Sequence, residues 1–154
     1  MTSAMHVLRL FVHARSRQPV LLLGEDGGDR CVPVFLRPPQ AEVIAAGPRG
    51  EESVPIPLDV LFPVVEALGR TLRSVEITDL VDGVYTAELV FDDDTRLSVL
   101  PSDALALAVR EQLPIAMADH VLEEAGQPDP GEPADKQVRE FREFIDEVTP
   151  DDFR

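Results

Sequence analysis

Carboxylates close to three expected helix starts are the residues of this chain best suited to chemistry. Asp103 follows Pro101 and Ser102 where one helix begins, Asp59 begins a second, and Glu42 lies early in a third. Helix N-termini carry partial positive charge, so capping is one interpretation of Ser102 or Asp103 and of Asp59. If the three helix starts converge, the same acids could surround a divalent ion or orient a water molecule.

Other common site chemistries find little support. His6 and His13 are seven residues apart on one expected strand and so face opposite sides of it, while His120 is remote. No serine lies in a nucleophile-elbow pattern and no glycine-rich phosphate loop is present. The acidic run at 92–94 falls at an expected hairpin tip, where a solvated turn explains it. No organic cofactor is expected.

Charge is distributed unevenly along the chain, whose formal net charge is −15. This total argues against indiscriminate nucleic-acid binding, because phosphates would meet a repulsive field. Residues 119–154 are strongly acidic, whereas arginines predominate near the N-terminus. The arginines that could form a basic surface there are Arg9, Arg15, Arg17, Arg30 and Arg37, and of these Arg9, Arg15, Arg17 and Arg37 are the candidates for binding nucleic acid. Scattered, solvated arginines are the alternative interpretation.

Nothing in the sequence predicts insertion into a membrane. No apolar run approaches the ~20 residues needed to cross a bilayer. The apolar stretch from Val7 to Val12 is interrupted by Arg9, and no small-residue cleavage site follows it. A lone cysteine, Cys31, excludes an internal disulfide, so the cytoplasm is the expected compartment and no membrane partner is expected.

The patterning of residues 1–126 predicts an α+β domain with a mixed, largely antiparallel sheet and helices packed on it. The apolar run 21–23 is continuous rather than alternating, which indicates a strand covered on both faces. Asp82-Gly83 has the composition of a hairpin turn. Strands are expected near 6–13, 19–24, 32–36, 71–80, 81–91, 95–100 and 114–116, and helices near 38–46, 58–68, 101–112 and 118–125.

The C-terminal part of the chain has a different character. Residues 127–135 are dense in proline, glycine and acid, as expected of a linker. Residues 136–154 are predicted to form an acidic amphipathic helix, with an apolar stripe made of Val138, Phe141, Ile145 and Val148. A helix this short is not stable alone in water, so it docks on its own domain or on a protein partner.

Three segments carry a resemblance to a known family. VEITDLVDGVYTAELVF at 75–91 and PSDALALAVREQLPIAMADHVLEEAG at 101–126 closely resemble the bifunctional nuclease domain family. RCVPVFLRPPQAEVIAA at 30–46 resembles that family's strand leading into a helix. The resemblance covers roughly residues 5–126. It implies an α+β fold, a homodimer, and hydrolysis of both RNA and DNA.

The chain departs from the family pattern at several polar positions. Arg37 and Gln40 stand where relatives usually have Gly and Glu, and Pro57-Leu58 replace a Thr-His pair. Leu100 replaces an arginine before Pro-Ser-Asp. The missing histidine removes a possible proton shuttle or metal ligand, and the missing arginine removes a possible phosphate clamp.

Two hypotheses follow. In the first, the protein is a nuclease that cleaves RNA or DNA phosphodiesters with Mg²⁺ or Mn²⁺. Asp103, Asp59 and Glu42 would be both metal ligands and catalytic carboxylates, with Ser102 as a further catalytic residue, and the N-terminal arginines would hold the nucleic-acid backbone. In the second, the protein is a catalytically weakened or inactive family member that acts as a dimeric protein-interaction or regulatory module.

Overall fold

One eight-stranded sheet runs through the protein, which the computed structural model describes over residues 1–129. Its strand order is β6-β5-β4-β7-β1-β2-β3-β8, and every neighbouring pair is antiparallel except β4 and β7. The expected α+β class with a mixed, largely antiparallel sheet is confirmed. The strands are β1 (Thr2–Val12), β2 (Pro19–Glu25), β3 (Arg30–Phe35), β4 (Leu72–Val81), β5 (Val84–Phe91), β6 (Arg96–Val99), β7 (Ile115–Ala118) and β8 (Gln127–Pro128).

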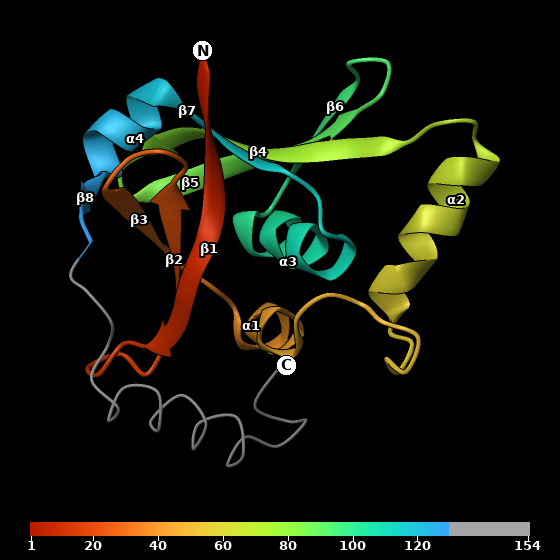
Figure 1. The fold of residues 1–154 in the computed structure, drawn as a ribbon, viewed down its shortest axis with the longest axis horizontal. Coiled ribbons are helices and arrows are strands. Elements are labelled where there is room, and N and C mark those ends of the chain that lie inside the picture. The colour runs from red at the N-terminus through yellow and green to blue at the C-terminus, as the bar shows by residue number, and fades with distance from the viewer. Residues whose placement is uncertain (130–154) are drawn as a thin grey trace.

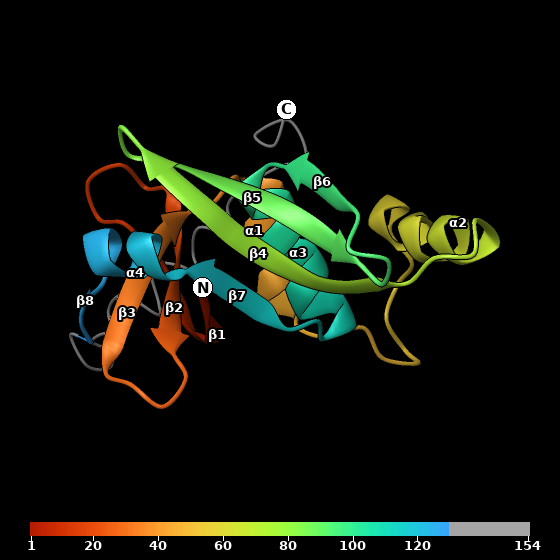
Figure 2. The same ribbon diagram turned by 90° about the horizontal axis from the view of Figure 1, so that it is seen from above.

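The helices are distributed unequally around this sheet. Two of them, α1 and α3, lie side by side against it, whereas α2 stands apart at one end of the molecule (Figures 1 and 2). The helical elements are α1 (Pro38–Ala46), the 3-10 turn η1 (Pro57–Val60), α2 (Leu61–Ala67), α3 (Pro101–Glu111) and α4 (Asp119–Ala125). None of the helices within 1–129 is long and apolar enough to cross a membrane.

A single apolar core lies between the sheet and the helices. Leu21 and Leu23 of β2 enter it together with Val32 and Val34 of β3, and all four helices contribute buried side chains. The α3 segment Ala104–Ala108 is completely or almost completely buried there. Its alternating Ala and Leu residues explain the close approach, because small side chains allow the helix backbone to approach the sheet.

The β4–β5 hairpin confirms the expected turn. Asp82 and Gly83 have φ values of 51° and 78°, and positive φ at both central residues is the conformation of a type I′ turn. Glycine adopts it without a steric penalty. The acidic run 92–94 likewise lies in a turn, between β5 and β6, where Asp93 and Asp94 form ion pairs with Arg70 and Arg73.

The capping roles expected from the sequence are wrong in position. The N-cap of α3 is Leu100, so Ser102 and Asp103 occupy its second and third positions, and no side chain caps the helix. Proline at the first position accounts for this start, because it lacks an N–H to be capped. Asp59 is the third residue of η1, where its carboxylate accepts a 2.9 Å hydrogen bond from the Ile56 N–H.

The expected linker begins at residue 127. Its first two residues, Gln127 and Pro128, form the short strand β8, which pairs with β3. Two residues of extended backbone suffice for this pairing, because the edge of β3 has free backbone N–H and C=O groups. The rest of the expected linker and the predicted helix 136–154 lie outside the described residues.

Candidate functional site

Asp103 lies where the first turns of α1 and α3 meet. Its Oδ1 accepts hydrogen bonds from Arg37 Nη2 at 3.1 Å and from Gln40 Nε2 at 2.8 Å. Its Oδ2 has no hydrogen bond to any residue between 1 and 129, and the side chain is 36% exposed. One oxygen of this carboxylate is therefore fixed by the protein, and the other can contact a water molecule or a ligand.

The amide of Gln40 is only partly satisfied at this place. Its Nε2 donates to Asp103, but its Oε1 is buried and has no hydrogen-bond partner within the described part of the chain. A buried polar atom without a partner costs free energy, so such an atom commonly marks the position of a water molecule or a ligand. The Asp103 site therefore contains a second polar atom, Gln40 Oε1, whose hydrogen bonding is incomplete within residues 1–129.

Ser102 positions the backbone rather than presenting a nucleophile. Its side chain is buried, and its Oγ accepts a 3.2 Å hydrogen bond from the backbone N–H of Arg37, the N-cap residue of α1. This contact ties the start of α1 to the start of α3. We therefore assign Ser102 to holding Arg37 next to Asp103.

A shallow hollow of about 280 Å³ adjoins this site. The Tyr85 hydroxyl at its wall donates to the Pro33 carbonyl at 3.1 Å, and burial raises the pKa of Tyr85. The lining is mostly apolar, which suits the flat face of a base or another planar group. The hollow is lined by Val34, Phe35, Arg37, Gly83, Val84, Tyr85, Leu100, Pro101 and Ser102.

Asp59 is committed to an ion pair with Arg110. Arg110 Nε donates to Oδ1 at 2.6 Å and its Nη2 donates to Oδ2 at 2.8 Å, so both carboxylate oxygens are occupied. The Asp59 side chain is 13% exposed and the Arg110 side chain is 6% exposed. The hydrogen bonds from Arg110, with that from the Ile56 N–H, lower the pKa of Asp59 to about 2. This pair fastens the segment before α2 onto α3.

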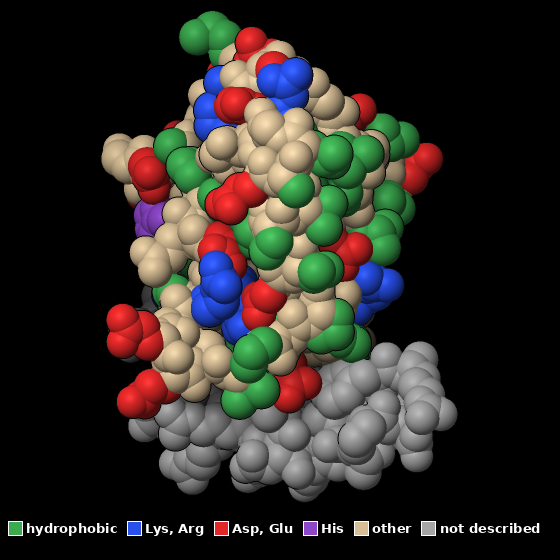
Figure 3. All heavy atoms as spheres, turned by 90° about the vertical axis from the view of Figure 1, so that its right-hand side faces the viewer, with side chains coloured by type: hydrophobic (Ala, Val, Ile, Leu, Met, Phe, Trp, Pro, Cys, Tyr) green, Lys and Arg blue, Asp and Glu red, His purple; other side chains and the backbone are tan. Residues whose placement is uncertain are grey.

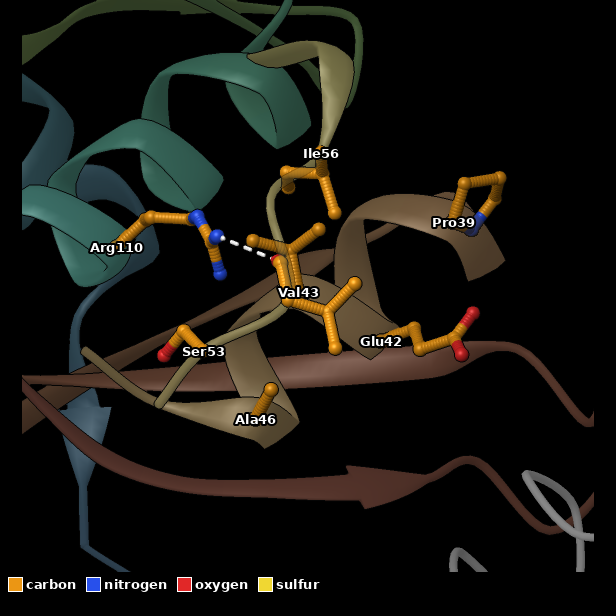
Figure 4. Close-up of a pocket in the computed structure, with 8 residues that line it drawn as sticks. Pro39, Glu42, Val43, Ala46, Ser53, Ile56 and Arg110 are labelled. Carbon is orange, nitrogen blue, oxygen red and sulfur yellow. Dashed lines mark hydrogen bonds between the residues drawn. The ribbon is translucent and has the colours of Figure 1, made fainter. Parts of the chain in front are cut away.

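Glu42 lies at the rim of a different cleft, of about 420 Å³, between α1 and residues 53–56 (Figure 4). Its carboxylate points away from Arg110, which lies on the other side of the cleft and donates to the Val54 carbonyl at 3.2 Å. Glu42 and Gln40 are two residues apart on α1, so their side chains leave the helix about 200° apart. Glu42 therefore points away from Asp103, which Gln40 contacts.

The three predicted carboxylates are not brought together in one chain. Asp103 and Arg110 are seven residues apart on α3, a separation of about 10 Å along the helix axis that also keeps Asp59 away from Asp103. Between residues 1 and 129, no three His, Cys, Asp or Glu side chains are grouped closely enough to hold a metal ion. These side chains do not fit a metal site built entirely from the protein.

Three of the four predicted arginines lie at one end of the sheet. Arg15 and Arg17 lie in the β1–β2 turn, and the Leu36 N–H donates to the Pro19 carbonyl next to that turn, which places Arg37 at the same end. Arg15 and Arg17 are exposed and their side chains pair with no residue in 1–129. Arg9 lies apart from them and forms an ion pair with Asp129.

The sequence interpretation missed two functional contacts, those of Gln40 and Arg110. The departure from the family pattern at Gln40 was a usable signal, because an amide there can donate to a neighbouring acid. Arg110 stood out less, although a lone arginine at the end of an Ala/Leu-rich helix is expected to need an acidic partner.

The comparisons with known proteins bear on this site. The model of the bifunctional nuclease domain matches residues 20–130. The chain belongs to the bifunctional nuclease domain family. An uncharacterized protein of Mycobacterium tuberculosis is 37% identical to it over 157 aligned positions, which cover 96% of each chain. Bifunctional nuclease 1 of Oryza sativa subsp. japonica and bifunctional nuclease of Oryza minuta are each 29% identical over 140 positions, covering 82% of this chain and 41% of theirs.

The matched range contains the whole Asp103 site of this bifunctional nuclease domain. It includes Arg37, Gln40 and Ser102, and it also includes the Asp59–Arg110 pair. It begins after Arg15 and Arg17, although these arginines lie at the same end of the sheet as Arg37. The Asp103 site and the Asp59–Arg110 pair therefore both lie within the family domain, whereas Arg15 and Arg17 lie before the matched range.

Proposed function

We propose that this member of the bifunctional nuclease domain family hydrolyses nucleic-acid phosphodiesters at Asp103. The observation that carries the proposal is the asymmetric Asp103 carboxylate. Its Oδ1 is held by Arg37 and Gln40, and its Oδ2 is open to water within the described part of the chain. A fixed carboxylate with one open oxygen beside a guanidinium is suited to orienting water against a bound phosphate.

Arg37 would bind the substrate phosphate. Its guanidinium is 53% exposed and uses only Nη2 on Asp103, so other N–H groups can reach a phosphate oxygen. The family arginine that usually precedes Pro-Ser-Asp is Leu100 here, and Arg37 supplies a guanidinium beside Asp103 in its place. Arg15 and Arg17 would bind neighbouring phosphates by charge attraction.

The proposed reaction is the attack of water on phosphorus. Asp103 Oδ2 accepts a proton as the water oxygen forms a bond to phosphorus, the bond from phosphorus to the leaving sugar oxygen breaks, and solvent protonates that oxygen. Arg37 offsets the charge that develops on the non-bridging oxygens. The Gln40 Oε1, which lacks a partner in residues 1–129, would accept a hydrogen bond from water or from a sugar hydroxyl.

The family resemblance also leads us to expect that the activity depends on a divalent metal. Mg²⁺ usually keeps several of its waters and binds one or two carboxylates together with substrate phosphates. The protein side chains in residues 1–129 do not form a complete metal cage, and the proposed steps use none. The assay of activity therefore needs arms with Mg²⁺, with Mn²⁺ and with a chelator.

The decisive experiment measures cleavage of labelled single-stranded RNA and DNA by the full chain. We expect Asp103→Asn to reduce the rate about 100-fold or more, because proton transfer by a positioned carboxylate contributes at least that much. Asp94→Asn is the matched control, since Asp94 is an exposed aspartate in an ion pair with Arg73. A folded Asp103→Asn protein that cleaves at the wild-type rate contradicts the proposal.

A second candidate function is a regulatory or protein-interaction module that retains the family fold without catalysis. The full commitment of Asp59 to Arg110 favours it, because this carboxylate is not available for a substrate or an ion. In that case the wild-type chain binds single-stranded nucleic acid or a protein without cleaving RNA or DNA under any metal condition.

We also infer that the protein forms a homodimer through the face that α2 presents. Hydrophobic side chains gather on that face (Figure 3), and Val64, Leu68 and Leu97 are 48%, 75% and 51% exposed. They border a hollow of about 330 Å³ beside β6, the strand at the sheet edge. Exposed apolar patches of this kind commonly mark contact surfaces.

A cytoplasmic location belongs to the same proposal. It is supported by the lone Cys31, which is free and buried and has no second cysteine with which to form a disulfide.

A further inference from the structure

The strands β1 to β3 have an apolar outer face. Leu21 and Leu23 of β2 point into the core, so the alternating Val20 and Leu22 point to the opposite side of the sheet. Strand pairing places Phe11 and Phe35 beside Val20, one from each neighbouring strand. These side chains continue the apolar character of β2 on its second face.

Leu8 extends this outer face at a bulge in β1. The register of β1 against β2 shifts between Val7 and Arg9, and Leu8 falls over Gly24. A Cβ at Gly24 would lie 2.8 Å from Leu8 Cγ, so the glycine makes room for the leucine. The outer face is therefore built to carry an apolar surface and not only polar, solvated side chains.

Val20 and Leu22 are nevertheless almost completely buried, at 2% exposure each. The buried apolar side chains of α1 to α4 all pack in the inner core, to which Val20 and Leu22 do not belong. Both views of the fold place α1 and α3 on one side of β1 and β2 (Figures 1 and 2). No helix in residues 1–129 therefore explains why Val20 and Leu22 are buried.

The chain turns onto this outer face where its described part ends. Cys31 and Arg9 belong to the outer face, since their strand partners are Gly24 and Leu22. Cys31 Sγ donates to the Pro128 carbonyl at 3.7 Å, and Arg9 forms an ion pair with Asp129. The segment that follows residue 129 therefore starts beside the apolar surface.

We propose that residues 136–148 fold back as an amphipathic helix onto the outer face of β1 to β3 of the same chain. The side chains that would contact this face are those of the apolar stripe, Val138, Phe141, Ile145 and Val148. The dimensions agree, because a helix of this length measures about 20 Å and the seven-residue β2 about 23 Å. Residues 130–135 can span up to about 20 Å, enough to connect β8 to any part of this face.

Charge favours this helix as the occupant. Arg15 and Arg17 lie in the turn that joins β1 and β2, at one end of the outer face. The polar side of the proposed helix carries Glu140, Glu143 and Glu147 against one base, Arg139. Docking in the same chain brings these opposite charges near one another, which steers the orientation of the helix.

Cysteine cross-linking tests the proposal in the full-length chain. In a Cys31→Ser background, Leu22→Cys is combined in turn with Val138→Cys, Phe141→Cys, Ile145→Cys or Val148→Cys, and mild oxidation is followed by mass spectrometry. We expect an intramolecular disulfide for at least one stripe position, in at least tenfold higher yield than for the control Glu143→Cys. Glu143 is the matched control because it lies on the opposite side of the predicted helix.

Two outcomes overturn the proposal. Disulfides that form only between chains would show that the tail of a second copy occupies the face. Yields no higher than for Glu143→Cys would show that the stripe does not lie on this face. The face would then be covered by a separate protein or by no part of the tail.

A second measurement does not depend on Leu22→Cys folding. In the otherwise native chain, Ile145→Asp is expected to lower Tm by about 4 °C or more, because it places a charge against an apolar surface. Glu143→Gln is expected to leave Tm unchanged. An unchanged Tm for Ile145→Asp would overturn the docking.

Discussion

Arg110 donates two hydrogen bonds to Asp59, at 2.6 and 2.8 Å, across a separation of 51 residues in the sequence. The bidentate geometry is that of the strongest class of protein ion pairs. It joins the end of α3 to the segment that leads into α2, whose Val65 is buried in the core. The pair therefore acts together with core packing to position α2.

Asp59→Asn should destabilise the fold although it changes few atoms. The substitution removes the charge that neutralises the buried Arg110 guanidinium, and an uncompensated buried charge is costly. We expect Tm to fall by about 6 °C or more in a thermal unfolding experiment. Asp93→Asn, which removes an ion pair at an exposed turn, should change Tm by less than about 2 °C. Equal effects of the two substitutions would argue against a structural role specific to Asp59.

The same pair should make stability depend on acid pH. The pKa of Asp59 is about 2 in the folded protein, below the value of about 3.9 for an unfolded chain, so the unfolded state binds a proton more readily. The stabilisation is present above about pH 5 and is lost as pH falls from 4 towards 2. In urea unfolding, the difference between wild type and Asp59→Asn should shrink over that range. A difference that stays constant between pH 6 and pH 3 would contradict this origin.

Arg37→Gln should weaken nucleic-acid binding and reduce its salt dependence. Loss of one phosphate contact is expected to lower the slope of log K against log salt by about one. Fluorescence anisotropy with labelled single-stranded RNA between 50 and 200 mM salt measures this slope. Arg73→Gln is the control, because Arg73 is equally exposed and pairs with Asp94 at the opposite part of the sheet. The same slope for both variants would remove Arg37 from the phosphate-binding residues.

Leu68→Asp should disrupt the proposed homodimer without unfolding the domain. Leu68 is 75% exposed, so a charge is tolerated in the monomer but not in an apolar contact between two copies. Sedimentation velocity should show a shift from dimer to monomer. Val81→Asp, at a site that is 56% exposed in another part of the molecule, should leave the mass unchanged. A wild-type chain that is already monomeric would refute the dimer.

The fold was predictable from local patterns, and the site largely was not. Alternation in β5 and the Asp82-Gly83 turn define the β4–β5 hairpin because both depend on neighbouring residues. The partners of Asp103 are 63 and 66 residues away, so no local spacing indicates them. Sequence spacing likewise does not reveal that Arg110 binds Asp59, because the two residues are 51 positions apart.

The helix starts illustrate how a small shift in a boundary changes the chemistry. Proline at the first position of α3 places Ser102 and Asp103 two and three residues beyond the N-cap, and neither side chain caps the helix backbone. Ser102 then binds the start of α1, and Asp103 binds Arg37 and Gln40.

The two borders of the sheet differ in their capacity to recruit another polypeptide. At the β8 border, Pro128 has no N–H, and the strand comprises only two residues, so an incoming extended peptide would find almost no donors there. The β6 border is a longer strand, Arg96–Val99, in which every residue carries an N–H and alternate ones point away from β5. Within residues 1–129, growth by strand addition, whether in normal assembly or in aggregation, is thus favoured at the β6 border over the β8 border.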